Sequence, residues 1–198
     1  MRFLPVVHPV TYQAALDAVA LCVSAGVKGL FLINQGINTS KTVDLFGEVR
    51  NKYPNLWIGI NLLGKTPRFA EMQGLNGIWA DNALGVLRPA RAFTYFGGVD
   101  FKYQKPVPPS QYASAIKACD ADVVTTSGPG TGKAPTLEKI LNFRKVYAGP
   151  LAIASGMNEE NIQPFLEHVN YFLIGTGIEK EFGILDPQKV ERMVKLLE

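Results

Sequence analysis

Residues 151–179 begin with Leu151-Ala-Ile-Ala-Ser-Gly-Met-Asn158 and end with Tyr171-Phe-Leu-Ile-Gly-Thr-Gly-Ile-Glu179. Each apolar run is typical of a buried strand and ends in a glycine-rich turn, which predicts two neighbouring parallel strands joined by a helix. Glycine-rich strand ends leave backbone N–H groups free at one rim of a sheet, where they suit phosphate or another anion. The residues expected to hold the anion are Ser155, Gly156, Gly175, Thr176 and Gly177.

The same strand-and-helix unit recurs along the 198 residues. Strand candidates lie at residues 1–8, 29–33, 56–61, 77–80, 92–97, 122–126, 151–154 and 171–174. Helices with apolar residues at helical spacing are expected between them, and their expected caps are Thr11, Thr39 or Ser40, Thr66, Asn158 and Asp186. The fourth helix is expected to be reduced or absent, because only about ten residues, including Pro89, separate Asn82 from the next strand.

Eight strands alternating with helices favour a closed parallel (β/α)8 barrel over an open sheet. A doubly wound, flavodoxin-like or Rossmann-like sheet is the alternative, but no Gly-x-Gly-x-x-Gly follows the first strand. The length predicts one barrel domain over residues 1–198.

Composition and charge limit the kinds of partner and the cellular location that we expect for the protein. The net charge is +3 with scattered Lys and Arg, which disfavours nucleic acid as a partner. Cys22 and Cys119 lie in apolar helical patterns, so buried free thiols in a reducing compartment are expected. The N-terminus lacks the features of a signal peptide, and no apolar run approaches the roughly 18 residues of a membrane span. We therefore expect a cytoplasmic protein without membrane insertion.

In a barrel of this kind, function resides where strands end. The polar residues expected at these ends are His8, Asn34, Asn61, Asp81, Asn82, Lys102, Thr125, Ser127, Ser155 and Thr176. The alternative for such residues is helix capping, which we favour for Thr39, Ser40, Asn158 and Asp186.

Three of these residues are the candidates for catalysis. His8 suits general acid/base chemistry, or else a structural hydrogen bond to a carbonyl. Asp81 suits a base or a ribose acceptor, with capping as the alternative, and Lys102 suits imine formation or, at lower cost, attraction of an anion. With only His8 and His168 available we expect no metal site and no cofactor, and Trp57 and Trp79 are read as core.

The loop Thr125-Thr-Ser-Gly-Pro-Gly-Thr-Gly-Lys133 superficially resembles a phosphate-binding Walker A loop. Ser127 occupies the position of its first glycine and Ala134 that of its magnesium ligand, so nucleoside triphosphate hydrolysis is not expected. The loop can instead fold over a ligand, with Thr131 and Lys133 as contacts, or form an ordinary exposed turn.

Several segments resemble known barrel families. The closing half of phosphoribosylanthranilate isomerases is similar to Gly130-Thr-Gly-Lys133, Ala154-Ser-Gly-Met-Asn-Glu-Glu-Asn161, Ile174-Gly-Thr-Gly-Ile-Glu179 and Gly183-Ile-Leu-Asp-Pro187. The BtpA-like family, associated by name with photosystem assembly, resembles the chain at Val6-Val-His-Pro9, Gly59-Ile-Asn-Leu-Leu63, Val99-Asp-Phe-Lys102 and Thr125-Thr-Ser-Gly-Pro-Gly-Thr-Gly132.

The resemblance implies a barrel of the ribulose-phosphate-binding group, with phosphate at Gly156 and at Gly175, Thr176 and Gly177. The isomerase's cysteine falls near Val7 and its aspartate near Thr125, so that isomerase activity is not expected. Two functions remain: an isomerase, lyase or glycosyl-transfer enzyme for a small phosphorylated sugar or nucleotide-like metabolite, or a non-catalytic assembly protein. The short fourth unit also suggests a homodimer, in which a second subunit covers the outer layer.

Overall fold

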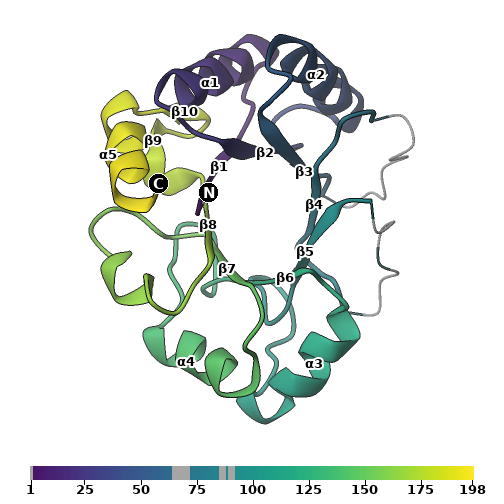
Figure 1. Ribbon diagram of the computed structural model, residues 1–198, viewed down its shortest axis with the longest axis vertical. Coiled ribbons are helices and arrows are strands. Elements are labelled where there is room, and N and C mark those ends of the chain that lie inside the picture. The colour runs from purple at the N-terminus through teal and green to yellow at the C-terminus, as the bar shows by residue number, and fades with distance from the viewer. Residues whose placement is uncertain (1, 64–71, 85–87, 89–91) are drawn as a thin grey trace.

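The computed structural model describes residues 2–63, 72–84, 88 and 92–198. Eight parallel strands form a closed barrel in chain order, with β8 hydrogen-bonded to β1 (Figure 1). The strands are β1 (Phe3–Val7), β2 (Gly29–Ile33), β3 (Trp57–Asn61), β4 (Gly77–Ala80), β5 (Thr94–Gly98), β6 (Val123–Thr126), β7 (Leu151–Ala154) and β8 (Tyr171–Ile174). The predicted (β/α)8 barrel is confirmed, with strand boundaries shifted by a few residues.

Helices surround the ring of strands, and Figure 1 views the ring end on. They are α1 (Tyr12–Ser24), α2 (Thr39–Lys52), α3 (Tyr112–Cys119), α4 (Leu137–Val146) and α5 (Pro187–Leu197), with single 3-10 turns at Pro109–Gln111, Gln163–Phe165 and Thr176–Ile178. The expected helix at Thr66 and the reduced fourth helix fall in segments outside the described residues. Among helices of the described segments, none is long and apolar enough to cross a membrane.

Helix caps test the sequence reading directly. Thr11 and Asp186 accept backbone N–H groups of α1 and α5, as predicted. The cap of α2 is Asn38 rather than Thr39 or Ser40, because the Asn38 side chain accepts from the Lys41 N–H. Asn158 caps no helix: its Oδ1 accepts from two N–H groups of a turn, and only the short 3-10 turn follows. A single 3-10 turn thus takes the place of the helix expected between β7 and β8.

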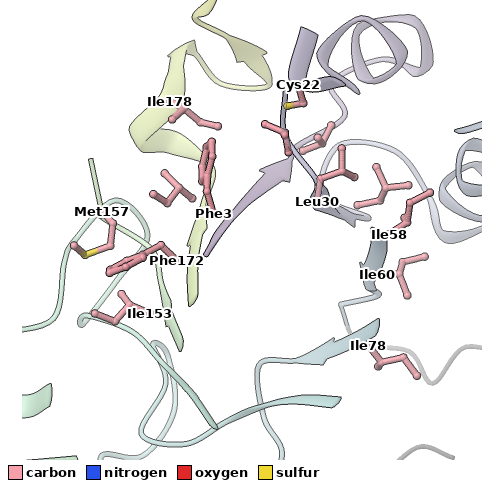
Figure 2. Close-up of a cluster of buried hydrophobic side chains, with 14 of the residues drawn as sticks. Phe3, Cys22, Leu30, Ile58, Ile60, Ile78, Ile153, Met157, Phe172 and Ile178 are labelled. Atoms are coloured by element: carbon pink, nitrogen blue, oxygen red, sulfur yellow. The ribbon is translucent and has the colours of Figure 1, made fainter. Parts of the chain in front are cut away.

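The core has two layers because successive strand residues point to opposite faces of the barrel wall. Phe31, Phe96 and Trp79 point inward, and their rings meet edge to face at 5.2–5.6 Å from Phe31. The other layer fills the space between strands and helices and includes Cys22 and Phe172 (Figure 2). Cys119 is also buried there, and both thiols are free, as predicted.

Three arginines stabilise the amino-terminal ends of strands, each through an Asn or Asp side chain whose oxygen also accepts a backbone N–H of a strand. Arg144 on α4 donates to Asn170 Oδ1 at 2.8 Å, and the same oxygen accepts the Leu151 N–H at 3.0 Å. The same arrangement occurs twice more, as Arg50 with Asn76 at the Ile58 N–H and Arg88 with Asp122 at the Tyr95 N–H. These contacts lie at the face of the barrel where stability, rather than chemistry, resides.

An antiparallel hairpin follows β8 before α5 begins. It consists of β9 (Glu179–Glu181) and β10 (Ile184–Leu185), and nothing in the sequence reading predicted it. The hairpin stands beside the carboxyl-terminal end of β1, because Gly183 lies against the His8 carbonyl. It therefore belongs to the rim that holds the site.

Candidate functional site

A pocket of about 190 Å³ opens at the carboxyl-terminal ends of the strands. Its lining residues are Val6, His8, Ile33, Gln35, Leu63, Trp79, Asp81, Lys102, Tyr103, Thr131, Ser155, Leu173, Gly175 and Thr176. His8, Asp81 and Gly175 each lie two residues beyond an inward-facing residue of the same strand, so strand alternation points them into the barrel mouth. The three candidate catalytic residues, His8, Asp81 and Lys102, thus share one pocket.

Lys102 lies between the loops that follow β5, β6 and β7. Its Nζ donates to Ser155 Oγ at 2.9 Å and lies 3.5 Å from Thr131 Oγ1. Its backbone N–H donates to the buried Ser127 Oγ at 2.7 Å, so Ser127 holds the lysine backbone instead of lining the pocket. The ammonium group is therefore placed beside the turn after β7, where it can attract an anion.

An ion pair behind the pocket fixes the loop that carries Lys102. Asp100 Oδ2 lies 2.9 Å from Lys139 Nζ, which also donates to the Ser127 carbonyl at 2.8 Å. Burial alone would raise the pKa of Asp100, but hydrogen bonds from the Val107 N–H, Lys139 and Tyr112 lower it overall. Because Asp100 and Lys139 satisfy each other's charge and hydrogen bonds, we interpret the pair as structural support for the loop that carries Lys102.

Asp81 is held by Asn61, whose Nδ2 donates to Asp81 Oδ1 at 2.9 Å. Burial raises the pKa of Asp81, although the Asn61 hydrogen bond and the charge of Lys102 act in the opposite direction. Asn61 is itself 2% exposed. The arrangement keeps a carboxyl group that is easier to protonate than usual beside a lysine.

His8 has a carboxylate partner that the sequence reading missed. Its Nδ1 lies 2.7 Å from Glu179 Oε1, with both side chains buried. The ring of Phe182 stacks on the imidazole at a centroid distance of 5.1 Å. The hairpin after β8 thus supplies two of the groups around the histidine.

The turns after β7 and β8 pack against each other and against the loop after β6. A Cβ on Gly156 would lie 2.1 Å from the Ala134 N, and one on Gly177 would lie 1.9 Å from the Met157 carbonyl oxygen, so only glycine allows these approaches. Ser155 adopts φ of 81°, a conformation that costs a non-glycine residue energy and is often retained at functional sites. Among the hydrogen bonds of the described residues, none uses the N–H of Gly156, Thr176 or Gly177 as donor.

Other predicted residues lie outside the pocket. Asn34 is tied to the loop after β3, since its Oδ1 accepts the Leu63 N–H at 2.6 Å. Asn82 and Lys133 are exposed and do not line the pocket. Thr125 is fully buried in the barrel wall below the pocket. Each of these four remains a prediction as a ligand contact.

The sequence reading missed several lining residues besides Glu179. Gln35 has the inward phase of β2, whereas the predicted Asn34 has the outward phase. Trp79, read as core, packs in the barrel interior and also forms pocket wall. Tyr103 follows Lys102 directly and its hydroxyl contacts Thr131, which only the loop conformation reveals. Strand phase alone identifies Gln35 and Trp79.

No group of three or more His, Cys, Asp or Glu suited to a metal ion occurs within the described parts of the chain. The pocket instead combines a lysine, a carboxyl group with a raised pKa and a histidine that is paired with a carboxylate. Thr176 adds a backbone N–H without an acceptor among the described residues, and Gly156 and Gly177 lie in the same turns without lining the pocket. Such a set can bind an anion and move protons.

The closed barrel with polar strand ends defines a class, the (β/α)8 barrels whose sites lie at the carboxyl-terminal rim. Within that class the chain belongs to the BtpA family, whose model matches residues 72–198. The resemblance to this family found in the sequence is thereby confirmed.

Two curated proteins are similar to this chain over part of its length. An uncharacterized protein of Pyrococcus horikoshii is 26% identical over 81 residues, which cover 41% of this chain and 31% of that protein. N-(5'-phosphoribosyl)anthranilate isomerase of Methanopyrus kandleri is 27% identical over 88 residues, 43% of this chain and 41% of that protein. The match thus spans less than half the length of either curated relative.

The structure of phosphoribosyl anthranilate isomerase from Thermus thermophilus superposes with a TM-score of 0.73 at 14% identity, over 99% of this chain and 100% of that one. At this identity the likeness concerns the fold alone.

Proposed function

We propose that this protein binds a small phosphorylated sugar or nucleotide-like metabolite and acts on it as an enzyme by acid/base chemistry. The observation that carries the proposal is that Lys102, Asp81 and His8 line the same pocket as the turns after β7 and β8. The ligand's phosphate lies on the free N–H groups of Gly156, Thr176 and Gly177, with Lys102 supplying the opposite charge.

The rest of the ligand faces His8 and Asp81. A carboxyl group with a raised pKa suits a general acid or base near neutral pH, and a histidine beside a carboxylate does the same. Isomerisation, elimination and glycosyl transfer all need a proton delivered to or removed from a carbon-bound oxygen or a neighbouring carbon. The proposal covers these three reaction classes.

Phosphoribosylanthranilate isomerisation is not among them. Val7, near which that enzyme's cysteine falls by the sequence resemblance, packs in the layer between strands and helices. Thr125, near which its aspartate falls, offers a hydroxyl that makes no hydrogen bond within the described residues. Neither residue can act as a general acid or base at neutral pH.

Thermal unfolding in the presence of ribose 5-phosphate, with ribose as the comparison, tests the proposal. The phosphorylated sugar should raise Tm by an amount that grows with its concentration, because it binds the folded state alone, and ribose should not. Thr176→Glu places a negative charge among the free N–H groups and should abolish the shift. Ser114→Glu, the same change on the exposed face of α3, should preserve it. If neither ribose 5-phosphate nor inorganic phosphate shifts Tm, the proposal is wrong.

The alternative is a non-catalytic assembly protein that keeps the barrel, and the residues at Val7 and Thr125 favour it over the isomerase itself. Metabolite profiling of cells carrying His8→Ala with Asp81→Asn separates the two functions. An accumulating phosphorylated metabolite, with the protein still folded, supports the enzyme. A phenotype produced only by surface substitutions supports assembly. We also propose a homodimer in the cytoplasm.

A further inference from the structure

We propose that Glu179 is a positioning residue that holds the proton of neutral His8 on Nδ1 and so leaves Nε2 as the atom that exchanges a proton with the ligand. The hydrogen-bonding part of this inference stands on the geometry alone. The part that concerns the ligand rests on the proposed function.

The two side chains form a close, enclosed contact. His8 Nδ1 and Glu179 Oε1 are 2.7 Å apart, and the side chains are only 9% and 3% exposed. An ionised carboxylate can only accept hydrogen bonds, so the neutral imidazole must carry its proton on Nδ1 to make this contact. Competition from water is weak at such burial, which favours one tautomer.

The imidazole ring is confined as well as bonded. Phe182 stacks on it with an interplanar angle of 23°, and Gly175 lies so close that a Cβ there would be 2.4 Å from His8 Cε1. A ring packed between these groups cannot flip over, so Nδ1 and Nε2 do not exchange places. The absence of a side chain at Gly175 is therefore part of how the histidine is seated.

Glu179 is fixed from its own side. Its backbone N–H donates to the Thr176 carbonyl, and its carbonyl accepts from Lys189 Nζ at 2.9 Å. The carboxylate thus projects from the junction between the 3-10 turn after β8 and the hairpin. An anion on Thr176 and Gly177 would lie within three residues of the group that orients the histidine.

The second ring nitrogen is left for the pocket. His8 lines the pocket, and Nε2 makes no hydrogen bond to the residues that the structure describes. In the neutral ring Nε2 is a base, and in the protonated ring Nε2–H is an acid. Nε2 can therefore accept a proton from the ligand or donate one to it, while Nδ1 keeps its proton and stays hydrogen-bonded to Glu179.

Long-range ¹H–¹⁵N NMR of the imidazole rings tests the positioning directly. The chain has only two histidines, and His168→Gln leaves the signals of His8 alone. At a pH where the ring is neutral, we expect Nδ1 to show the shift of a protonated nitrogen and Nε2 that of an unprotonated one. The opposite tautomer, or the averaged pattern of a free imidazole, would overturn the proposal in the wild-type protein itself.

Variants assign the cause. Glu179→Ala should shift His8 to the Nε2–H tautomer or to an averaged pattern, and Glu179→Gln should give a mixture, since its amide can also donate to Nδ1. Glu181→Ala removes the exposed carboxylate of the same hairpin and should leave the pattern unchanged. A folded Glu179→Ala protein with the wild-type pattern would contradict a positioning role.

Addition of ribose 5-phosphate tests the ligand's part. Binding should move the Nε2 resonance of His8 and keep the proton on Nδ1. If the sugar phosphate binds, as judged by Tm, without moving Nε2, the role of His8 is overturned. If neither ribose 5-phosphate nor inorganic phosphate binds, the proposed function fails, while the ligand-free spectrum still decides the role of Glu179.

Discussion

At the scale of single residues, the site is a balance between stability and chemistry. Asp81 is a carboxyl group that burial makes harder to ionise, and Ser155 holds a backbone conformation that disfavours any side chain. Both lower the stability of the folded state, and both line the pocket. Residues of this kind are retained when they serve a function.

Asp81→Asn should therefore stabilise the protein at neutral pH. The pKa of Asp81 is raised in the folded state, so the unfolded carboxyl ionises first and wild-type stability falls as pH rises from about 4 towards the folded pKa. Asparagine keeps an acceptor for Asn61 and does not titrate. Tm of the variant should exceed that of wild type at pH 7, by about 2–4 °C for each kcal/mol gained, and the difference should vanish below pH ~4.

Asp17→Asn is the matched control, because Asp17 is exposed on α1. Its Tm difference from wild type should be small at every pH. A variant Asp81→Asn that is less stable than wild type at pH 7 would contradict the account of the pKa.

Strand phase explains which site residues could be found in the sequence. His8 and Asp81 were predicted because each directly follows an apolar strand, and each also has the inward phase. Asn34 shared the first property and lacked the second, while Gln35 had the phase and was passed over. Glu179 lies 171 residues from His8, and its pairing depends on a hairpin without a local signal.

At the scale of elements, the loops after two strands join at the edge of the pocket. Tyr103 and Thr131 connect the loops after β5 and β6: the Thr131 N–H donates to the tyrosine oxygen at 3.0 Å, and the tyrosine hydroxyl lies 3.1 Å from Thr131 Oγ1. These bonds lower the pKa of Tyr103, although its side chain is largely exposed. The two loops are thus held together by one aromatic residue at the pocket's edge.

Tyr103→Phe should loosen this connection without changing the barrel. The Thr131 N–H loses its acceptor on Tyr103, so amide exchange at Thr131 should accelerate severalfold. Hydrogen–deuterium exchange by NMR measures this at single amides. Tyr53→Phe, which removes the hydroxyl of a half-buried tyrosine at the end of α2, should leave exchange at Thr131 as in wild type. Equal exchange in Tyr103→Phe and wild type would show that the loops are held otherwise.

The arginine braces belong to the same scale, on the opposite face. Arg144 donates four hydrogen bonds, to the carbonyls of His168, Tyr147 and Gly149 and to Asn170. Arg144→Met should lower stability by about 2 kcal/mol, or Tm by roughly 4–8 °C, since several acceptors lose a charged donor. Denaturant titration measures the change, and Lys145→Met on the exposed side of α4 should have little effect. A loss no larger than that of the lysine variant would mean the brace is dispensable.

At the scale of the whole molecule, the repeat of apolar strand and helix was enough to predict the barrel. The number of strands favours a closed barrel over an open sheet, and the strands themselves are evident as apolar runs such as Gly29–Ile33. The sequence misplaced a helix after Asn158 because a good capping residue also stabilises a turn. Capping signals locate a chain reversal and do not establish that a helix follows.

The homodimer is a prediction at this scale. Sedimentation equilibrium should give twice the chain mass of 21.6 kDa. The short segment between Asn82 and the fifth strand leaves little sequence for an outer helix, so a second subunit is expected to cover that side. A mass equal to one chain at micromolar concentration would contradict the prediction.

The central claim is that the turns after β7 and β8 hold a phosphate group. Amide NMR during titration with ribose 5-phosphate tests it most directly, because it reports the N–H groups themselves. The account predicts that the largest shifts occur at Gly156, Thr176 and Gly177, that they saturate, and that ribose does not produce them. Saturating binding that leaves these three amides unmoved would contradict it.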